Sequence, residues 1–181
     1  MASAMAALPA MARAQDGVRT TQPYQAAPVV APFSQPALAL SDSIVALARD
    51  QLGARYVFGG ASPRRGFDCS GLVAYIANAL HIAVPRTARL QARIGEPVPR
   101  DTAQLLPGDL LTFGRGSRVS HVGIYVGHGR FIQASTKAGH VIESALIRPF
   151  ARGIKPWQGV RRLVALADGD STQAAGEPAS H

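Results

Sequence analysis

The sequence predicts an α+β domain in which helices come first and an antiparallel sheet follows. Two amphipathic segments with a period near 3.6 residues occupy positions 41–53 and 69–80, and short alternating segments between Gly-rich turns occupy positions 110–143. Helices followed by strands are typical of α+β folds, in which a helix packs on the sheet. A chain of 181 residues, 47% of them hydrophobic, can bury one ordinary core.

The ends of the chain differ in composition from its middle. Residues 1–14 are rich in Ala and Met and end in the small-residue pattern Ala-Arg-Ala, which indicates the remnant of an export signal without its basic front part. An Ala-rich disordered terminus is the alternative. Residues 15–40, rich in Pro, Ala and Gln, predict a disordered linker, and residues 168–181 a disordered tail. The folded domain is therefore expected at 41–167.

Both predicted helices begin at a residue suited to cap them. Ser41 or Asp42 can cap the first helix, and Gly53 is placed to end it. Asp68 can cap the second helix, whose first residue is Cys69. The apolar faces are formed by Ile44, Val45, Leu47, Ala48 and Leu52 in the first helix and by Leu72, Val73, Ile76, Ala77 and Leu80 in the second.

Four short strands are expected after the turn Pro107-Gly108-Asp109. Each combines apolar or β-branched residues with flanking glycines. The predicted strands are Leu110–Phe113, Val119–Val126, Arg130–Ala134 and Val141–Glu143.

Charge and cysteine content exclude several classes of function. The net charge of +8 comes mostly from scattered arginines, without a run of five basic residues, so we expect no nucleic-acid binding; an anionic wall polymer fits better. No apolar stretch approaches the roughly twenty residues of a transmembrane helix. The single cysteine excludes an internal disulfide and a multi-cysteine metal site, which leaves a buried structural thiol or a reactive one.

Cys69 has the position of a reactive thiol. The helix dipole favours the thiolate by only about 0.3–1 kcal/mol, so a neighbouring imidazolium has to supply the larger part. Of the five histidines, only His121 falls inside a predicted strand, which makes it the candidate general base.

Gln133 is the candidate that orients this histidine. If a three-residue loop joins the two strands, Val126 faces Arg130, and His121 and Gln133 become diagonal neighbours on one face. We expect Gln133 to accept the Nδ1–H of His121, so that Nε2 points to Cys69. The alternatives are a cysteine and a histidine that only fill the core, and a glutamine that faces solvent.

The segment from Gly66 to Val73, with sequence GFDCSGLV, resembles the nucleophile motif of the NlpC-type family of cell-wall peptidases. Further segments of the family occur in the same order, and the resemblance covers about residues 44–165. These segments are Tyr56-Val57-Phe58-Gly59-Gly60, Pro85-Arg86-Thr87, Leu106-Pro107-Gly108-Asp109-Leu110 and Ser120-His121-Val122-Gly123-Ile124-Tyr125.

This resemblance implies a papain-like fold and an exported, periplasmic or wall-associated enzyme. The implied reaction is hydrolysis of a peptide bond in the peptidoglycan stem peptide or its cross-link, through a thioester at Cys69, without metal or cofactor. By resemblance, Tyr56 and Asp68 help to bind the substrate, and we expect a monomer. The backbone N–H of Cys69 is one expected donor to the oxyanion.

Two residues depart from the family pattern, and two other functions stay open. Phe58 stands where the family usually has Trp, and Gln133 where it most often has His. A neutral amide supports an imidazolium less than a carboxylate does, so activity could be slow or sensitive to pH. The alternatives are a peptidoglycan-binding module without catalysis and a related thiol amidase or acyltransferase. Arg86 could pair with a substrate carboxylate or be structural.

Overall fold

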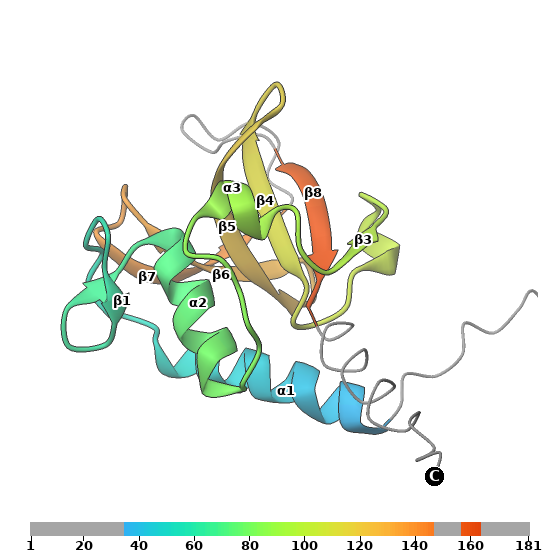
Figure 1. Ribbon diagram of the computed structural model, residues 1–181, viewed down its shortest axis with the longest axis horizontal. Helices are drawn as coiled ribbons and strands as arrows, with labels where there is room; N and C mark the ends of the chain where they lie inside the picture. Colours follow the sequence, from blue (N-terminus) through green and yellow to red (C-terminus); the bar gives the residue numbers. More distant parts are fainter. Residues whose placement is uncertain (1–34, 147–156, 164–181) are drawn as a thin grey trace, which may run out of the picture. The chain divides into compact units, whose positions relative to one another are not determined.

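In this computed structural model, which describes residues 35–146 and 157–163, helices precede a large sheet along the chain (Figure 1). The helical elements are α1 (Gln35–Asp50), α2 (Cys69–Ala79), α3 (Ala88–Gln91) and the short 3₁₀ helix η1 (Thr102–Gln104). The strands are β1 (Ala61–Ser62), β2 (Gly66–Phe67), β3 (Glu96–Val98), β4 (Leu110–Arg115), β5 (Arg118–Gly127), β6 (Arg130–Ser135), β7 (His140–Ala145) and β8 (Trp157–Arg162). This is the expected α+β class.

Six strands form one antiparallel sheet in the order β3–β8–β4–β5–β6–β7. Strands β1 and β2 form a separate small hairpin before α2. Helix α2 packs on β5 and β6, and α1 packs on α2 and β5. The helix that carries the cysteine therefore lies directly on the centre of the sheet.

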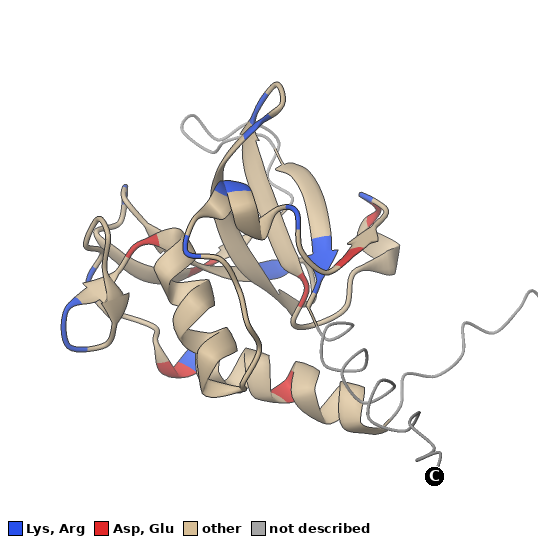
Figure 2. Cartoon of the chain, in the orientation of Figure 1, with Lys and Arg blue, Asp and Glu red and all other residues tan. Residues whose placement is uncertain are grey.

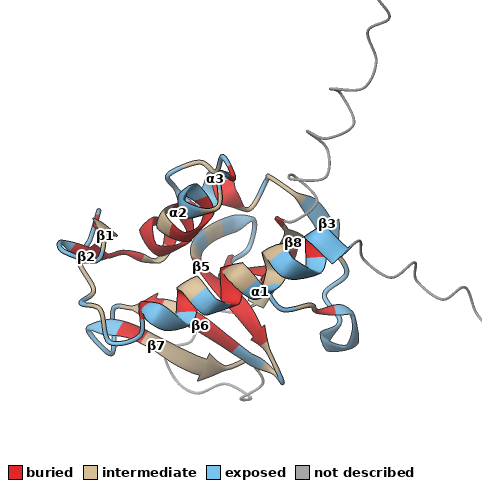
Figure 3. Cartoon of the chain, turned by 90° about the horizontal axis from the view of Figure 1, so that it is seen from below, coloured by how far each residue is buried: buried red, intermediate tan, exposed pale blue. Residues whose placement is uncertain are grey.

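The core has two parts because the sheet buries apolar residues on both faces. Leu110 belongs to the cluster between the sheet and the helices, whereas the next residue, Leu111, belongs to a cluster with Phe113 and Phe131 on the other face. This is the alternation expected of a strand. Figure 3 shows buried residues along α2 and along the strands beneath it.

The first helix begins six residues earlier than predicted, so the expected linker boundary at residue 40 is wrong. Pro36 suits the first turn of a helix, and alternating Ala and Leu follow it. Ser41 and Ser43 lie inside the helix, and the Ser43 hydroxyl bonds to the carbonyl oxygen of Ala39 at 2.8 Å. A serine inside a helix can thus donate its hydroxyl to a carbonyl oxygen of the preceding turn, so a serine need not mark the start of a helix.

The four predicted strands are confirmed to within two residues at each end, but β8 and the short strands β1, β2 and β3 were missed. Strand β8 pairs with both β3 and β4, so it is internal to the sheet. Its sequence, Trp-Gln-Gly-Val-Arg-Arg, lacks a continuous apolar alternation. The predicted export-signal remnant at 1–14 and the predicted tail at 168–181 lie outside the described residues.

The hairpin between β5 and β6 is tighter than predicted. His128 and Gly129 form a two-residue turn with φ of 51° and 68°, and Gly127 pairs with Arg130. The expected pairing of Val126 with Arg130 is therefore wrong. A register shift between Tyr125 and Gly127 compensates for the shorter turn. Beyond this shift Ile124 pairs with Ile132, which is the same pairing that the predicted three-residue loop would give.

Candidate active site

Cys69 is the first residue of α2, and Asp68 caps that helix as predicted. Asp68 has extended backbone angles, φ −90° and ψ 176°, and its Oδ1 accepts a hydrogen bond from the backbone N–H of Gly71 at 2.6 Å. The Cys69 side chain is half-buried. The thiol thus lies at the positive end of the helix dipole, where a thiolate is favoured.

The Asp68 carboxylate also accepts hydrogen bonds from the neighbouring Ser70 and from two other segments of the chain. Its Oδ2 accepts from the backbone N–H of Gly59 at 2.9 Å, and the Ser70 hydroxyl donates to Oδ1 at 3.2 Å. Arg86 donates to both oxygens, at 3.0 and 2.8 Å. Burial by itself raises the pKa of Asp68, but the bonds from Arg86, Gly71 and Gly59 outweigh it and lower the pKa below 3.8.

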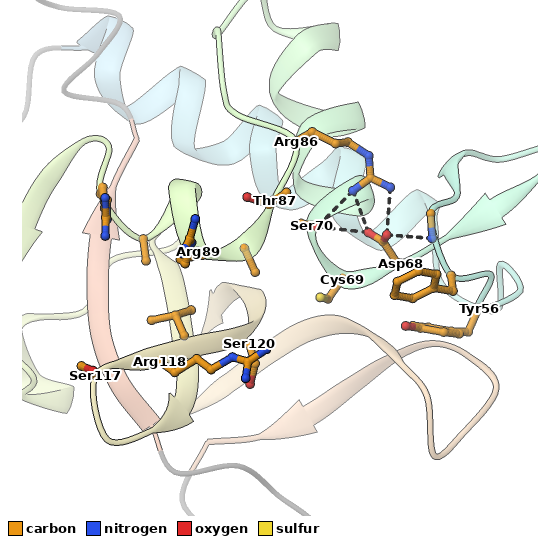
Figure 4. Close-up of a pocket in the computed structure, with 16 residues that line it drawn as sticks. Tyr56, Asp68, Cys69, Ser70, Arg86, Thr87, Arg89, Ser117, Arg118 and Ser120 are labelled. Atoms are coloured by element: carbon orange, nitrogen blue, oxygen red, sulfur yellow. Dashed lines mark hydrogen bonds and ion pairs between the residues drawn. The ribbon is translucent and has the colours of Figure 1, made fainter.

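Arg86 is the residue whose role the sequence left undecided. Besides Asp68, it bonds to the Ser70 hydroxyl at 3.0 Å and to the carbonyl oxygen of Gly60 at 3.3 Å. Its side chain is 42% exposed and that of Asp68 is 11% exposed, so the pair lies at the wall of the site (Figure 4). Arg86 therefore ties the segment before α3 to the start of the cysteine helix.

Glycines allow the backbone segments around Cys69 to meet. The N–H of Asp68 donates to the carbonyl oxygen of Gly60 at 3.0 Å. A Cβ at Gly71 would overlap that same carbonyl oxygen, and a Cβ at Gly60 would overlap the carbonyl oxygen of Gly66. The glycines of the two sequence motifs are thus required by close packing of backbone on backbone.

His121, Gln133 and Ser144 form a chain of hydrogen bonds across three strands. The Nε2 of His121 lies 2.5 Å from the Oε1 of Gln133, and the Nε2 of Gln133 donates to the Ser144 hydroxyl at 2.9 Å. The predicted contact between His121 and Gln133 is confirmed, but the predicted nitrogen is wrong, because Nε2 and not Nδ1 faces Gln133. With the proton on Nε2, Nδ1 is the basic nitrogen of the imidazole.

The orientation of the imidazole is a tertiary property. His121 pairs with Phe113 across the β4–β5 ladder, and the two rings pack with centroids 5.8 Å apart. Ser144 was missed by the sequence analysis, since only the pairing of β6 with β7 brings it beside Gln133. Its hydroxyl anchors the amide so that the amide oxygen faces the histidine.

Tyr56 lies on the same side of the site as Asp68. Burial raises the pKa of the Tyr56 phenol above its ordinary value, and the negative charges of Cys69 and Asp68 add to this effect. The phenol therefore stays protonated and can donate a hydrogen bond. Phe58 lies in the same Tyr56–Gly60 segment and also lines the site. Its side chain is 89% exposed.

Tyr56, Phe58, Asp68 and Arg86 border a groove of about 1110 Å³ that passes Cys69 (Figure 4). Tyr56 and Asp68 lie to one side of the cysteine, and the residues of α3 and the start of β5 lie to the other. Within the described ranges, no group of three or more His, Cys, Asp or Glu side chains could hold a metal ion. In the same ranges, no helix is long and apolar enough to cross a membrane.

A helix that begins with a half-buried cysteine and packs on an antiparallel sheet defines the papain-like α+β class. The chain matches the NlpC/P60 family over residues 53–153, and it belongs to that family. The family predicted from the GFDCSGLV segment is thereby confirmed.

Several curated relatives are peptidases or hydrolases by name. The chain is 47% identical to the γ-DL-glutamyl hydrolase of Bacillus subtilis over 95 residues, which cover 51% of this chain and 22% of the relative. It is 46% identical to the murein DD-endopeptidase MepH of Escherichia coli over 97 residues, 51% of this chain and 35% of the relative. The chain thus spans about a third or less of the length of these two proteins.

Solved structures show the same fold. NlpC2 from Trichomonas vaginalis is 35% identical, with a TM-score of 0.61, and the match covers 68% of this chain and 47% of that one. The peptidoglycan hydrolase RipB from Mycobacterium tuberculosis is 32% identical, with a TM-score of 0.59, over 70% of this chain and 66% of that one. These matches confirm the predicted fold class.

Proposed function

We propose that this protein is a cysteine endopeptidase that cleaves a peptide bond in the stem peptides or cross-links of peptidoglycan, with Cys69 as nucleophile. The observation that carries the proposal is the pairing of two features. Cys69 begins a helix packed on the sheet, and the sheet holds His121 in a fixed orientation through Gln133 and Ser144. The names of the relatives, which include murein endopeptidases and peptidoglycan hydrolases, support the substrate class.

In the first half of the reaction, Nδ1 of His121 takes the proton of the Cys69 thiol. The thiolate attacks the carbonyl carbon of the scissile bond, and the negative charge that develops on its oxygen lies near the positive end of α2. The C–N bond then breaks, the imidazolium protonates the leaving amine, and the acyl group remains on Cys69 as a thioester.

In the second half, water replaces the amine. The imidazole takes a proton from water, and the resulting hydroxide attacks the thioester. The C–S bond then breaks to release the carboxylic acid, and the imidazolium returns its proton to the Cys69 thiolate. Gln133 acts in both halves as a positioning residue, because its Oε1 accepts the Nε2–H of His121 and holds the ring in place. The mechanism requires no metal or cofactor.

Tyr56 and Asp68 are proposed to bind the substrate on one side of the cleaved bond. The protonated phenol of Tyr56 can donate to the substrate, and Asp68 borders the groove beside it. Asp68 already accepts bonds from Arg86, Gly59 and Gly71, so its carboxylate is held in a fixed position and its charge is paired with that of Arg86. This arrangement suits an amide N–H group of the peptide.

The proposed place of action is the cell envelope, to which the substrate is confined. The net charge of +8 suits an anionic wall polymer, and no role in nucleic-acid binding is proposed. We propose export through a signal of which residues 1–14 are the remnant, a catalytic domain that extends to residue 167, and action as a monomer.

Mass spectrometry of purified muropeptides after incubation with the protein tests this function. The wild-type protein is expected to produce fragments that identify the cleaved bond, and the Cys69→Ala variant none. Fragments from both proteins would refute the role of Cys69. Products joined to an added amine would indicate an acyltransferase, and binding of muropeptides without any cleavage would indicate a binding module.

A further inference from the structure

Three arginines line the groove that passes Cys69. Arg89 lies in α3, Arg93 follows that helix, and Arg118 begins β5. Figure 4 shows Arg89 and Arg118 across the cysteine from Tyr56 and Asp68. The basic segments on α3 and at the β4–β5 hairpin are also visible in Figure 2.

The positive charge of these side chains is not balanced by nearby carboxylates. In residues 35–146 and 157–163, the ion pairs of arginine involve Arg86, Arg130 and Arg162, and none involves the three groove arginines. All three are exposed. Among the described residues, Asp68 is the one acidic side chain that lines the groove, and it is paired with Arg86. This half of the groove therefore carries net positive charge.

Arg118 is placed where its charge is locally unfavourable. It faces Arg115 across the β4–β5 ladder, and like charges directly opposite each other repel. An anion bound in the groove would offset this repulsion. The hydroxyl residues Thr87 and Ser117 line the same part of the groove and suit the oxygens of such an anion.

We infer that Arg89, Arg93 and Arg118 form a subsite for a free carboxylate of the peptide substrate, on the opposite side of the cleaved bond from Asp68 and Tyr56. The inference rests on the function proposed above. A guanidinium donates two parallel hydrogen bonds to a carboxylate, and the groove that holds these arginines is continuous with Cys69. A peptide carboxylate is favoured over a wall phosphate because the arginines line the cleft of the nucleophile itself.

The test uses synthetic stem peptides in which each free carboxylate is replaced singly by a carboxamide. Their affinities are measured by calorimetry with the Cys69→Ala variant, which reports binding without cleavage, and their kcat/KM values with the wild-type protein. One replacement is expected to weaken binding roughly tenfold, the equivalent of about 1.4 kcal/mol and close to the value of one hydrogen bond to a charged group. The difference should shrink as salt is raised.

Two variants link that difference to the groove. In the background of Cys69→Ala, the double substitution Arg89→Gln and Arg118→Gln should bring the affinities of the carboxylate and carboxamide peptides together. Arg49→Gln removes the same charge from the last turn of α1, outside the groove lining, so it should leave the tenfold ratio unchanged.

The outcomes separate the subsite from the reaction. Binding that depends on one carboxylate and on the groove arginines, without cleavage by the wild-type protein, would support the subsite and refute the peptidase. Cleavage with equal affinity for every peptide would support the peptidase and overturn the subsite. Loss of sedimentation with purified cell walls in the arginine variants, at unchanged peptide affinities, would overturn it in favour of a wall polymer.

Discussion

The ion pair between Asp68 and Arg86 is predicted to stabilise the start of the cysteine helix. Arg86 makes two contacts to the carboxylate, at 2.8 and 3.0 Å, and the side chains are 11% and 42% exposed. Loss of one partner costs about 3–5 kcal/mol in a buried pair, and exposed pairs contribute about 0.2–1 kcal/mol. Asp68 retains its other donors, so Arg86→Gln is expected to lower the free energy of unfolding by about 1–2 kcal/mol.

A double-mutant cycle isolates the interaction itself. Asp68→Asn, Arg86→Gln and the double variant are unfolded with urea at about pH 7, followed by the fluorescence of Trp157, the single tryptophan. The coupling energy is expected to be about 1 kcal/mol. The pair Arg130–Glu143 is the matched control: its contact is also 2.8 Å, but its side chains are 46% and 30% exposed, so its coupling should stay below about 0.5 kcal/mol.

A coupling energy for Asp68–Arg86 that equals that of the control would refute this reasoning. The dependence on pH gives a second check. Because the pKa of Asp68 is lower in the folded protein than in the unfolded chain, its contribution is fully present above about pH 4 and is lost as pH falls through the folded pKa. The stability difference between wild type and Asp68→Asn should therefore shrink in acid, and a difference that grew in acid would contradict the assigned cause.

Three further predictions concern catalysis and packing. Gln133→Ala should lower kcat roughly 10- to 100-fold with little change in KM, because the imidazole of His121 loses the bond that orients it but no substrate contact is removed. If Gln133 had only a structural role, the substitution would change thermal unfolding and leave kcat per folded molecule unchanged. Gly71→Ala should lower the free energy of unfolding by about 1–3 kcal/mol, since the new Cβ overlaps the carbonyl oxygen of Gly60. An unchanged free energy of unfolding in urea would show that Gly71 and Gly60 are not packed this closely. Asp109→Asn should cost about 3 kcal/mol in the same assay, because Asp109 is 1% exposed and pairs with Arg162 at 2.8 Å, and a cost below about 1 kcal/mol would mean that this pair is not effectively buried.

Local signals were sufficient for most of the fold. The helix that begins at Cys69 follows from an N-cap aspartate and a stripe of apolar residues, and both are adjacent in sequence to the residues they affect. Strands β4 to β7 follow from alternation between glycine-rich turns. The start of α1 was misplaced because Ser41 resembles a cap, although it lies inside the helix and its hydroxyl donates to the carbonyl oxygen of Pro107 in a distant segment.

Strand β8 could not be predicted in the same way. It enters the sheet between β3 and β4, which lie far from it in sequence, and its polar and glycine residues carry little strand signal of their own. The strength of a strand depends largely on the neighbours it packs against, and these are decided by the tertiary fold.

The sequence by itself determined which residues carry the proposed chemistry. A lone cysteine after an N-cap aspartate, and a histidine and a glutamine spaced to meet on neighbouring strands, are properties of short segments and of the two-residue period of a strand. Only the tertiary structure decided which nitrogen of His121 faces Gln133, that Ser144 anchors that amide, and that Arg86 holds Asp68. These contacts join segments distant in the chain, and their geometry depends on how side chains pack once the sheet and helices have met.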